Sequence, residues 1–178
     1  MGANNKKIDI KKCKIKMLVD SREKSNKHLL DVWDKKGIDY YTPPKGLRTG
    51  DYSIAIQLPD GEVVDFRDKI VIERKNSLEE LSTNITKHRE RFINELERAK
   101  ENNTKFILLI EDDKWYENLV RGNYETFTHK NSYLASIMAF KSRYDLEIIG
   151  IDKRFVGSYI YKELYYFAYE YLKNMDEI

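Results

Sequence analysis

The segment Ile70–Leu81, IVIERKNSLEEL, constrains the fold most, because it begins as a core strand and then becomes charged. Three β-branched residues run directly into Glu73, Arg74 and Lys75, and a helix-like stretch follows. Burying a charge is costly unless another group pairs with it. Side chains alternate between the two faces of a strand, so Glu73 and Lys75 point to one face and Arg74 to the other. The segment therefore predicts a strand that ends either in a polar site or in solvent.

A carboxylate and an ammonium on one face of a strand can act together on a phosphate. The carboxylate binds a divalent metal, and the lysine orients the attacking water or stabilises the charge that develops on phosphorus. The simpler interpretation is a strand that leaves the core and pairs its charges in solvent. A single E-x-K tripeptide does not distinguish the two, so the site hypothesis requires further acidic residues.

Two aspartates occupy positions where strands are expected to begin or end. Asp51 follows a glycine and opens DYSIAIQL, and Asp20 closes KIKMLVD. If both converge with Glu73 beside Lys75, they form an oxygen-rich site for Mg²⁺ or Mn²⁺. Without a cation, the three carboxylates would repel one another. Taken singly, Asp51 is equally well a turn residue, and Asp20 a helix cap or a partner of Arg22.

Composition excludes several classes of protein. The 178 residues suit one domain, and a net charge of +2 excludes a uniformly basic nucleic-acid coat. Cys13 is the single cysteine, which excludes an internal disulfide and a cysteine-based zinc cluster and fits the cytoplasm, or the nucleoid if the source is bacterial or phage. No apolar run reaches the length of a membrane span, and no P-loop or dinucleotide fingerprint is present. We therefore expect neither a membrane partner nor a nucleotide cofactor.

The hydrophobic pattern predicts strands separated by helices, with a hairpin around the PDG turn. The expected strands are 14–20, 38–42, 51–58, 62–66, 69–73, 105–111 and 146–151. The expected helices are 25–37, 77–102, 132–144 and 156–173. This order indicates an α/β sandwich. We expect one domain over residues 15–178, preceded by a flexible basic arm over residues 1–14.

Three stretches, VDSRE (19–23), GDYSI (50–54) and VIERK (71–75), together resemble the nuclease domain of the XPF/Hef family of structure-specific DNA endonucleases. The resemblance continues through RERFINELERAKENNTKFILLIEDD (89–113) and covers roughly residues 15–172. It implies a restriction-endonuclease-like α/β fold, in which helices flank a mixed central sheet with an inserted β-hairpin. It also implies a Mg²⁺- or Mn²⁺-dependent endonuclease that hydrolyses phosphodiester bonds of branched, flap or junction DNA.

The resemblance implies roles at the matched positions only. Asp51 and Glu73 would be metal ligands, and Lys75 would orient the water or stabilise the transition state. Arg74 would brace neighbouring carboxylates or reach DNA. The residues that would complete the pocket wall are Asp20, which is also a candidate ligand, Arg22 and Glu23.

One departure from the family pattern concerns an acidic position after the lysine. The family usually has Asp as the fourth residue after the lysine. Direct counting matches Glu79, whereas aligning the apolar residues that follow matches Glu80 with one residue inserted. Ser77-x-x-Glu80 is also a capping box, and we expect Glu80 to be a cap. Both glutamates remain doubtful as ligands.

A second departure concerns DNA binding. Many members carry paired helix-hairpin-helix modules after the nuclease, and this sequence has none, so we expect a stand-alone nuclease that binds DNA through its own surface. The candidate contacts are Arg22, Lys87, Arg89, Arg91, Lys141, Arg143 and Arg154. A solvated helix face explains the group at 87–91 equally well.

Assembly is predicted from the last helix. Nuclease domains of this family commonly pair, and an apolar stripe is formed by Ile160, Leu164, Phe167 and Tyr171. An apolar surface this wide predicts a homodimer.

Two alternatives to the endonuclease remain. One is a non-catalytic DNA-binding or scaffold subunit of the same fold, and the other is a resolvase or restriction-type nuclease. Scaffold members typically lose GDY or ERK residues, and this sequence keeps both, which favours the enzyme.

Overall fold

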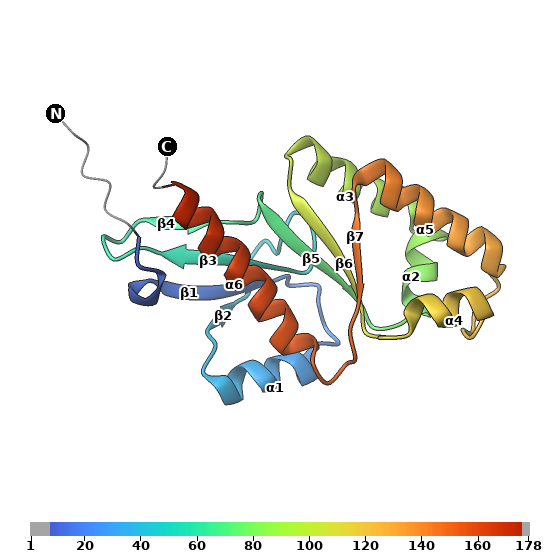
Figure 1. Cartoon of the computed structure of the whole chain (residues 1–178), viewed down its shortest axis with the longest axis horizontal. Helices are drawn as coiled ribbons and strands as arrows, with labels where there is room; N and C mark the ends of the chain where they lie inside the picture. The colour runs from blue at the N-terminus through green and yellow to red at the C-terminus, as the bar shows by residue number, and fades with distance from the viewer. Residues whose placement is uncertain (1–7, 176–178) are drawn as a thin grey trace.

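The computed structural model describes residues 8–175, which form a seven-stranded mixed sheet with helices on both faces (Figure 1). In chain order the elements are η1 (Ile10–Lys12), β1 (Lys14–Val19), α1 (Lys27–Lys36), β2 (Tyr40–Tyr41), β3 (Tyr52–Gln57), β4 (Val63–Asp65), β5 (Ile70–Lys75), α2 (Leu78–Ile85), α3 (Arg89–Glu101), β6 (Lys105–Ile110), α4 (Trp115–Arg121), α5 (Lys130–Tyr144), β7 (Glu147–Gly150) and α6 (Val156–Met175). Within residues 8–175, no helix is both long and apolar enough to cross a membrane.

The sheet has an antiparallel half and a parallel half that meet at β5. Its strand order is β2-β1-β3-β5-β6-β7, and β4 pairs with β3 outside that path. β3 is antiparallel to β1, β4 and β5, whereas β5, β6 and β7 are parallel. The β3–β4 connection turns at Gly61, whose φ of +96° favours glycine. The predicted mixed sheet and its inserted hairpin are confirmed.

Two layers of helices cover different parts of the sheet. α1 and α6 pack on one face against Met17, Ile54 and Ile72, and this core extends to Ile107 on β6. α2, α3 and α5 pack on the other face against alternate residues of β5 and β6, such as Val71 and Leu108. Figure 1 shows α1 and α6 together at one side of the molecule and α2 to α5 gathered at the other. β6 is therefore buried on both faces, as its continuous apolar run predicts.

The sequence predicted one continuous helix over residues 77–102, and this prediction is wrong. The chain forms α2 and α3, and the break begins at Thr86, which leaves the helical conformation with φ −113° and ψ −84°. The Thr86 hydroxyl donates a 2.7 Å hydrogen bond to the Ser82 carbonyl. Such local side-chain bonds compete with continued helix, and a periodic apolar pattern does not reveal them.

The stripe used to predict a homodimer faces the protein's own core. Ile160 and Leu164 are fully buried against the sheet, in line with Ala168 and Leu172. Phe167 and Tyr171, the other two residues of the stripe, are partly buried and pack against the Phe66 ring, so most of the stripe is used within the chain. The homodimer stays a prediction with no surface assigned to it.

Part of the expected arm is also packed. Residues 8–14 include η1, and Ile10 is buried in the core below α6. Residues 1–7 lie outside the described part of the chain.

Candidate active site

The charged end of β5 stays inside the protein. β5 lies between β3 and β6, and Glu73, Arg74 and Lys75 are each at most 4% exposed. The Lys75 ammonium donates a 2.6 Å hydrogen bond to Glu73 Oε1 on the face covered by α2 and α3. Arg74 points to the opposite face. The strand therefore ends in charges that are paired inside the protein.

A cavity of about 240 Å³ opens beside Glu73 and Lys75, and we call it the β5 pocket. The residues that line it are Arg22, Glu23, Asp51, Glu73, Lys75, Glu80, Arg91 and Glu95. Five carboxylates thus share the space with three cationic groups. The structure brings together Asp51, Glu73 and Lys75, which the sequence placed in one site.

Asp51 is fixed to the charged strand by the main chain. The Arg74 amide donates a 2.8 Å hydrogen bond to Asp51 Oδ2, and the Asp51 amide donates to the Ile72 carbonyl at 2.9 Å. The preceding Gly50 has φ +71°, and a Cβ there would lie 2.8 Å from Cβ of Val71. Only glycine allows this approach. Burial, followed by the nearby Glu73 carboxylate, raises the pKa of Asp51 well above its usual value.

The residue that the sequence analysis missed is Glu95. It is 7% exposed on α3, and its Oε1 accepts a 2.9 Å hydrogen bond from the Gly50 amide. Burial and then the Glu73 charge raise the pKa of Glu95. A signal for it was present in the sequence, since position 95 lies on the same helical face as Phe92 and Ala99, which are buried. A glutamate on the apolar face of an amphipathic helix requires a polar site opposite it.

Lys75 carries its positive charge in this environment. Burial disfavours the ammonium, but the Glu73 and Asp51 carboxylates outweigh burial and raise the pKa of Lys75. A second carboxylate, Glu80 Oε1, lies 3.8 Å from the ammonium. Lys75 can therefore supply a fixed cation to a phosphate that enters the β5 pocket.

Glu80 and Glu79 have different surroundings. The Glu80 amide donates to Ser77 Oγ at 3.4 Å, and Glu80 Oε2 accepts from the Asn76 amide at 2.9 Å. Glu80 thus caps α2 and also lines the β5 pocket. Glu79 Oε1 instead accepts from the Glu125 amide at 2.8 Å, away from the pocket. The structure therefore favours Glu80 over Glu79 as the acidic residue near the site.

Asp20 was expected to be a metal ligand, but in the structure its carboxylate is bonded to other protein groups. Its carboxylate accepts 2.8 Å hydrogen bonds from the amide and Nε of Arg22, and the Leu47 amide donates to it at 2.5 Å. Burial opposes ionisation, yet these hydrogen bonds lower the pKa of Asp20. Asp20 does not line the β5 pocket. Because its oxygens are already engaged, Asp20 positions Arg22 and the loop at residues 43–50.

Arg74 braces carboxylates, one of the two roles that the resemblance implied. Its Nη2 lies 2.6 Å from Glu23 Oε1 and its Nη1 lies 2.9 Å from Glu111 Oε1. Glu111 also contacts His28 Nε2 at 2.7 Å. Glu23 in turn lines the β5 pocket, so the buried Arg74 holds one wall of the pocket from the opposite face of the sheet.

The candidate DNA contacts divide into two groups. Arg22 and Arg91 line the β5 pocket. The other candidates do not line the pocket. Lys87 is exposed between α2 and α3, and the Arg89 guanidinium lies 4.8 Å from the centre of the Phe140 ring. Lys141 and Arg143 lie in the last turn of α5, and Arg154 Nη2 lies 2.7 Å from Asp152 Oδ2.

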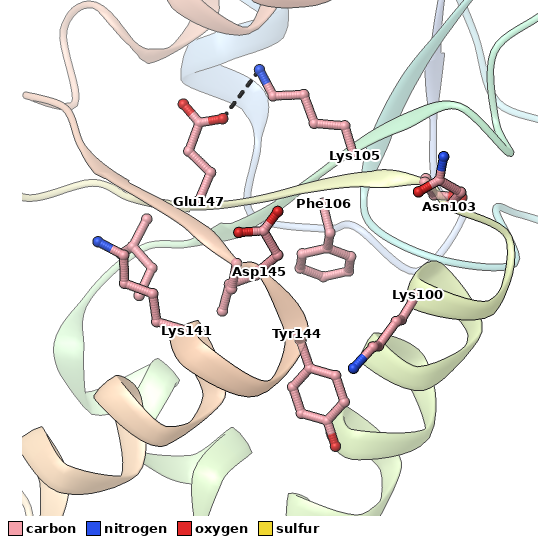
Figure 2. A pocket seen from close by; sticks show the side chains of 11 residues that line it. Lys100, Asn103, Lys105, Phe106, Lys141, Tyr144, Asp145 and Glu147 are labelled. Carbon is pink, nitrogen blue, oxygen red and sulfur yellow. Dashed lines mark ion pairs between the residues drawn. The ribbon is translucent and has the colours of Figure 1, made fainter.

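A larger cavity of about 640 Å³ lies at the opposite end of the parallel strands (Figure 2). It is lined by the first residues of β6 and β7 and by the ends of α3 and α5, and Lys105 pairs there with Glu147 at 3.1 Å. Its side chains mix both signs of charge. Lys141 borders this cavity, which places it and the neighbouring Arg143 at the wrong end of the sheet to contact a phosphate in the β5 pocket.

The donors in the β5 pocket fit a hard divalent cation. Within residues 8–175, no three Asp, Glu, His or Cys side chains form a ready-made metal cage. Mg²⁺, however, usually takes only one or two protein carboxylates, and water and substrate phosphates complete its shell. Asp51 and Glu73 can supply two. Burial and then the Glu73 charge raise the pKa values of Asp51 and Glu95, and a bound cation would offset the second of these causes.

Comparisons with known proteins agree with the fold. Residues 19–162 match the family model described as the ERCC4 domain. The XPF protein from Aeropyrum pernix is similar in structure, with a TM-score of 0.58 and 18% identity over 84% of this chain and 59% of that chain. XPF from Aeropyrum pernix in complex with DNA matches with a TM-score of 0.57 and 18% identity over 87% of this chain and 65% of that chain. The matched region is thus less than two thirds of either solved chain. No curated protein matches the sequence significantly.

Proposed function

The chain belongs to the ERCC4 domain family, and we propose that it is a divalent-metal-dependent DNA endonuclease that acts on branched, flap or junction DNA. The observation that carries the proposal is the β5 pocket, where Asp51, Glu73 and Glu95 lie beside a buried lysine. Its carboxylates outnumber its cations. That imbalance costs stability unless a divalent cation binds there.

The proposed cofactor is Mg²⁺ or Mn²⁺, held by Asp51 and Glu73. When bound, it would activate the attacking water and polarise the phosphate. Lys75 would place its ammonium against the charge that develops on phosphorus. Glu95 would be a positioning residue, because it accepts a hydrogen bond from the Gly50 amide and thereby fixes the turn that carries Asp51.

DNA would reach the pocket across its basic rim. Asp20 holds Arg22 in place, and the Arg22 side chain is still 65% exposed. Arg91 on α3 also lines the pocket. Both can pair with phosphates, which position DNA without reading its sequence. This arrangement suits an enzyme that recognises the shape of its substrate.

One experiment separates this proposal from a non-catalytic DNA-binding or scaffold subunit. The protein is incubated with labelled duplex, flap, fork and four-way junction DNA in Mg²⁺, in Mn²⁺ or in EDTA. We expect metal-dependent cleavage of the branched DNAs and none by a Glu73→Gln variant. DNA binding without cleavage in either metal would favour the scaffold. Preferential cutting of plain duplex would favour a restriction-type enzyme.

A further inference from the structure

The sheet face that carries the β5 pocket is covered by helices only over β5, β6 and β7. The register places Ala55 of β3 and Lys16 of β1 on the same face as Asp51, because Tyr52 pairs with Ile72 on the opposite face. Neither Ala55 nor Lys16 belongs to either apolar core of residues 8–175. The antiparallel half of the sheet is therefore open beside the pocket.

This open face contains a hollow of about 510 Å³, and we call it the β-platform. Ala55 forms the small centre of its floor, next to Leu18 and Val63, and Tyr41 and Pro44 stand at its side. Val63 is 58% exposed and Tyr41 is 46% exposed. A flat, partly apolar floor with an exposed aromatic ring can accept a planar ligand such as a nucleobase.

Cations surround the β-platform. Lys16 and Lys45 line the hollow, and Lys14 lies one pleat further along β1. No carboxylate within residues 8–175 forms an ion pair with any of these three lysines, whereas Arg67 is paired with Asp65. The Lys16 ammonium lies 6.0 Å from the centre of the Tyr41 ring. Lysines around an aromatic platform are the combination that binds phosphates and bases of single-stranded nucleic acid.

The β-platform and the β5 pocket lie on the same sheet face and share no lining residue. Ala55 is the fourth residue after Asp51, so about 13 Å of extended chain joins the two positions. The loop at residues 43–50 joins the two surfaces. Its Lys45 borders the hollow, and its Gly50 amide is bonded to Glu95 in the pocket. A strand lying on the β-platform would therefore be led to the carboxylates.

We propose that the β-platform binds a single-stranded arm of the DNA and directs it into the β5 pocket. The proposal rests on the proposed endonuclease function and assigns the single-stranded arm of that substrate to a sheet face outside the β5 pocket. A second copy of the chain fits this surface less well. A two-fold interface centred here would bring Lys16 and Lys45 of one copy against the same lysines of the other.

The test measures DNA binding in EDTA, where cleavage cannot contribute. Fluorescence anisotropy would report the affinity of the full chain for a 12-nucleotide single strand and for a 12-base-pair duplex. Tyr41→Ala is expected to weaken single-strand binding about 10-fold and to leave duplex binding unchanged, whereas Tyr41→Phe keeps the ring and the affinity. The matched control is Tyr166→Ala, which removes a tyrosine that is 59% exposed on α6 at the other face of the sheet. It should bind both DNAs as wild type does.

A second pair of variants tests the phosphate contacts. Replacing Lys14 and Lys16 by glutamine should reduce the slope of log affinity against log salt for the single strand by about 1.4, at about 0.7 per phosphate. The control, Lys162→Gln on α6, should not change that slope. All of these side chains are at least partly exposed, so circular dichroism and thermal unfolding should match wild type.

Three outcomes would overturn the proposal. The first is wild-type single-strand affinity in Tyr41→Ala. The second is displacement of the strand by poly-glutamate as readily as by DNA, because bases would then not matter. The third is a change in assembly: if sedimentation shows that the wild type is a dimer and Tyr41→Ala is a monomer, the β-platform binds a second copy of the chain.

The same experiments test the proposed nuclease function independently of the β-platform. If no DNA is cut in any metal but Tyr41 governs single-strand binding, the β-platform stands and the enzyme does not. If a flap is cut with the same KM and kcat by wild type and Tyr41→Ala, the enzyme stands and the β-platform does not.

Discussion

Replacing Lys75 by methionine removes the ammonium that compensates the carboxylates of the β5 pocket and keeps the aliphatic stem. The Lys75 and Glu73 side chains are both 5% exposed, and their charged atoms lie 2.6 Å apart. The pair thus belongs to the buried class, in which removing one partner costs about 3–5 kcal/mol. An exposed pair would be worth only about 0.2–1 kcal/mol. For a chain of this size, a loss of about 3–5 kcal/mol corresponds to a fall in Tm of about 6–20 °C.

The assay is thermal and urea unfolding of the metal-free protein at pH 7, followed by circular dichroism. The double variant Lys75→Met/Glu73→Gln removes both charges, and we expect it to recover most of the lost stability, because a neutral pair of similar volume leaves no unpaired charge. Mg²⁺ should stabilise Lys75→Met more than wild type, since the cation replaces the missing charge. Turnover should be lost in both variants. A Lys75→Met protein within about 1 kcal/mol of wild type would refute the reasoning, because it would place the pair in the exposed class.

Three further predictions follow from the same geometry. Glu73→Gln should abolish cleavage and weaken Mg²⁺ binding measured by calorimetry, and full cleavage at saturating Mg²⁺ would leave Glu73 a structural residue. The raised pKa values of Asp51 and Glu95 mean that the native state holds protons more tightly than the unfolded state, so stability should fall as pH rises from about 4 through the raised pKa values. Without metal, Tm should therefore be higher at pH 5 than at pH 7, and the reverse trend would contradict the assignment. Arg91→Ala should reduce the salt dependence of duplex binding by about 0.9 in log–log slope, whereas Arg143→Ala at the other end of the sheet should not; an unchanged slope in Arg91→Ala would place the DNA elsewhere.

Local sequence was sufficient for the centre of the site. The alternation of side chains along a strand placed Glu73 and Lys75 on one face and Arg74 on the other, and the structure has them so. The glycine before Asp51 likewise marked a turn that only glycine can make. These features depend on neighbours within a few residues, so the order of the amino acids reveals them.

Contacts between elements far apart in the chain decided the rest of the pocket. Glu95 reaches the Gly50 amide across 45 residues, whereas Asp20 turns to Arg22 and Leu47. Helical spacing showed which face of α3 is apolar, but not which loop lies opposite it. The sequence pattern therefore suggested Asp20 as the third carboxylate beside Asp51 and Glu73, whereas the structure places Glu95 in the β5 pocket.

The sequence by itself determined that this chain builds a mixed sheet with a charged strand end at its centre. Strand alternation, β-branched runs and glycine turns are local consequences of covalent geometry and burial. Tertiary structure alone decided which groups surround that strand end. It placed Arg74 between the carboxylates of Glu23 and Glu111. It also left the sheet face around Tyr41 uncovered, because α2, α3 and α5 pack only over the parallel strands. Strand order and helix placement depend on the packing of the whole chain, and no short stretch of residues encodes them.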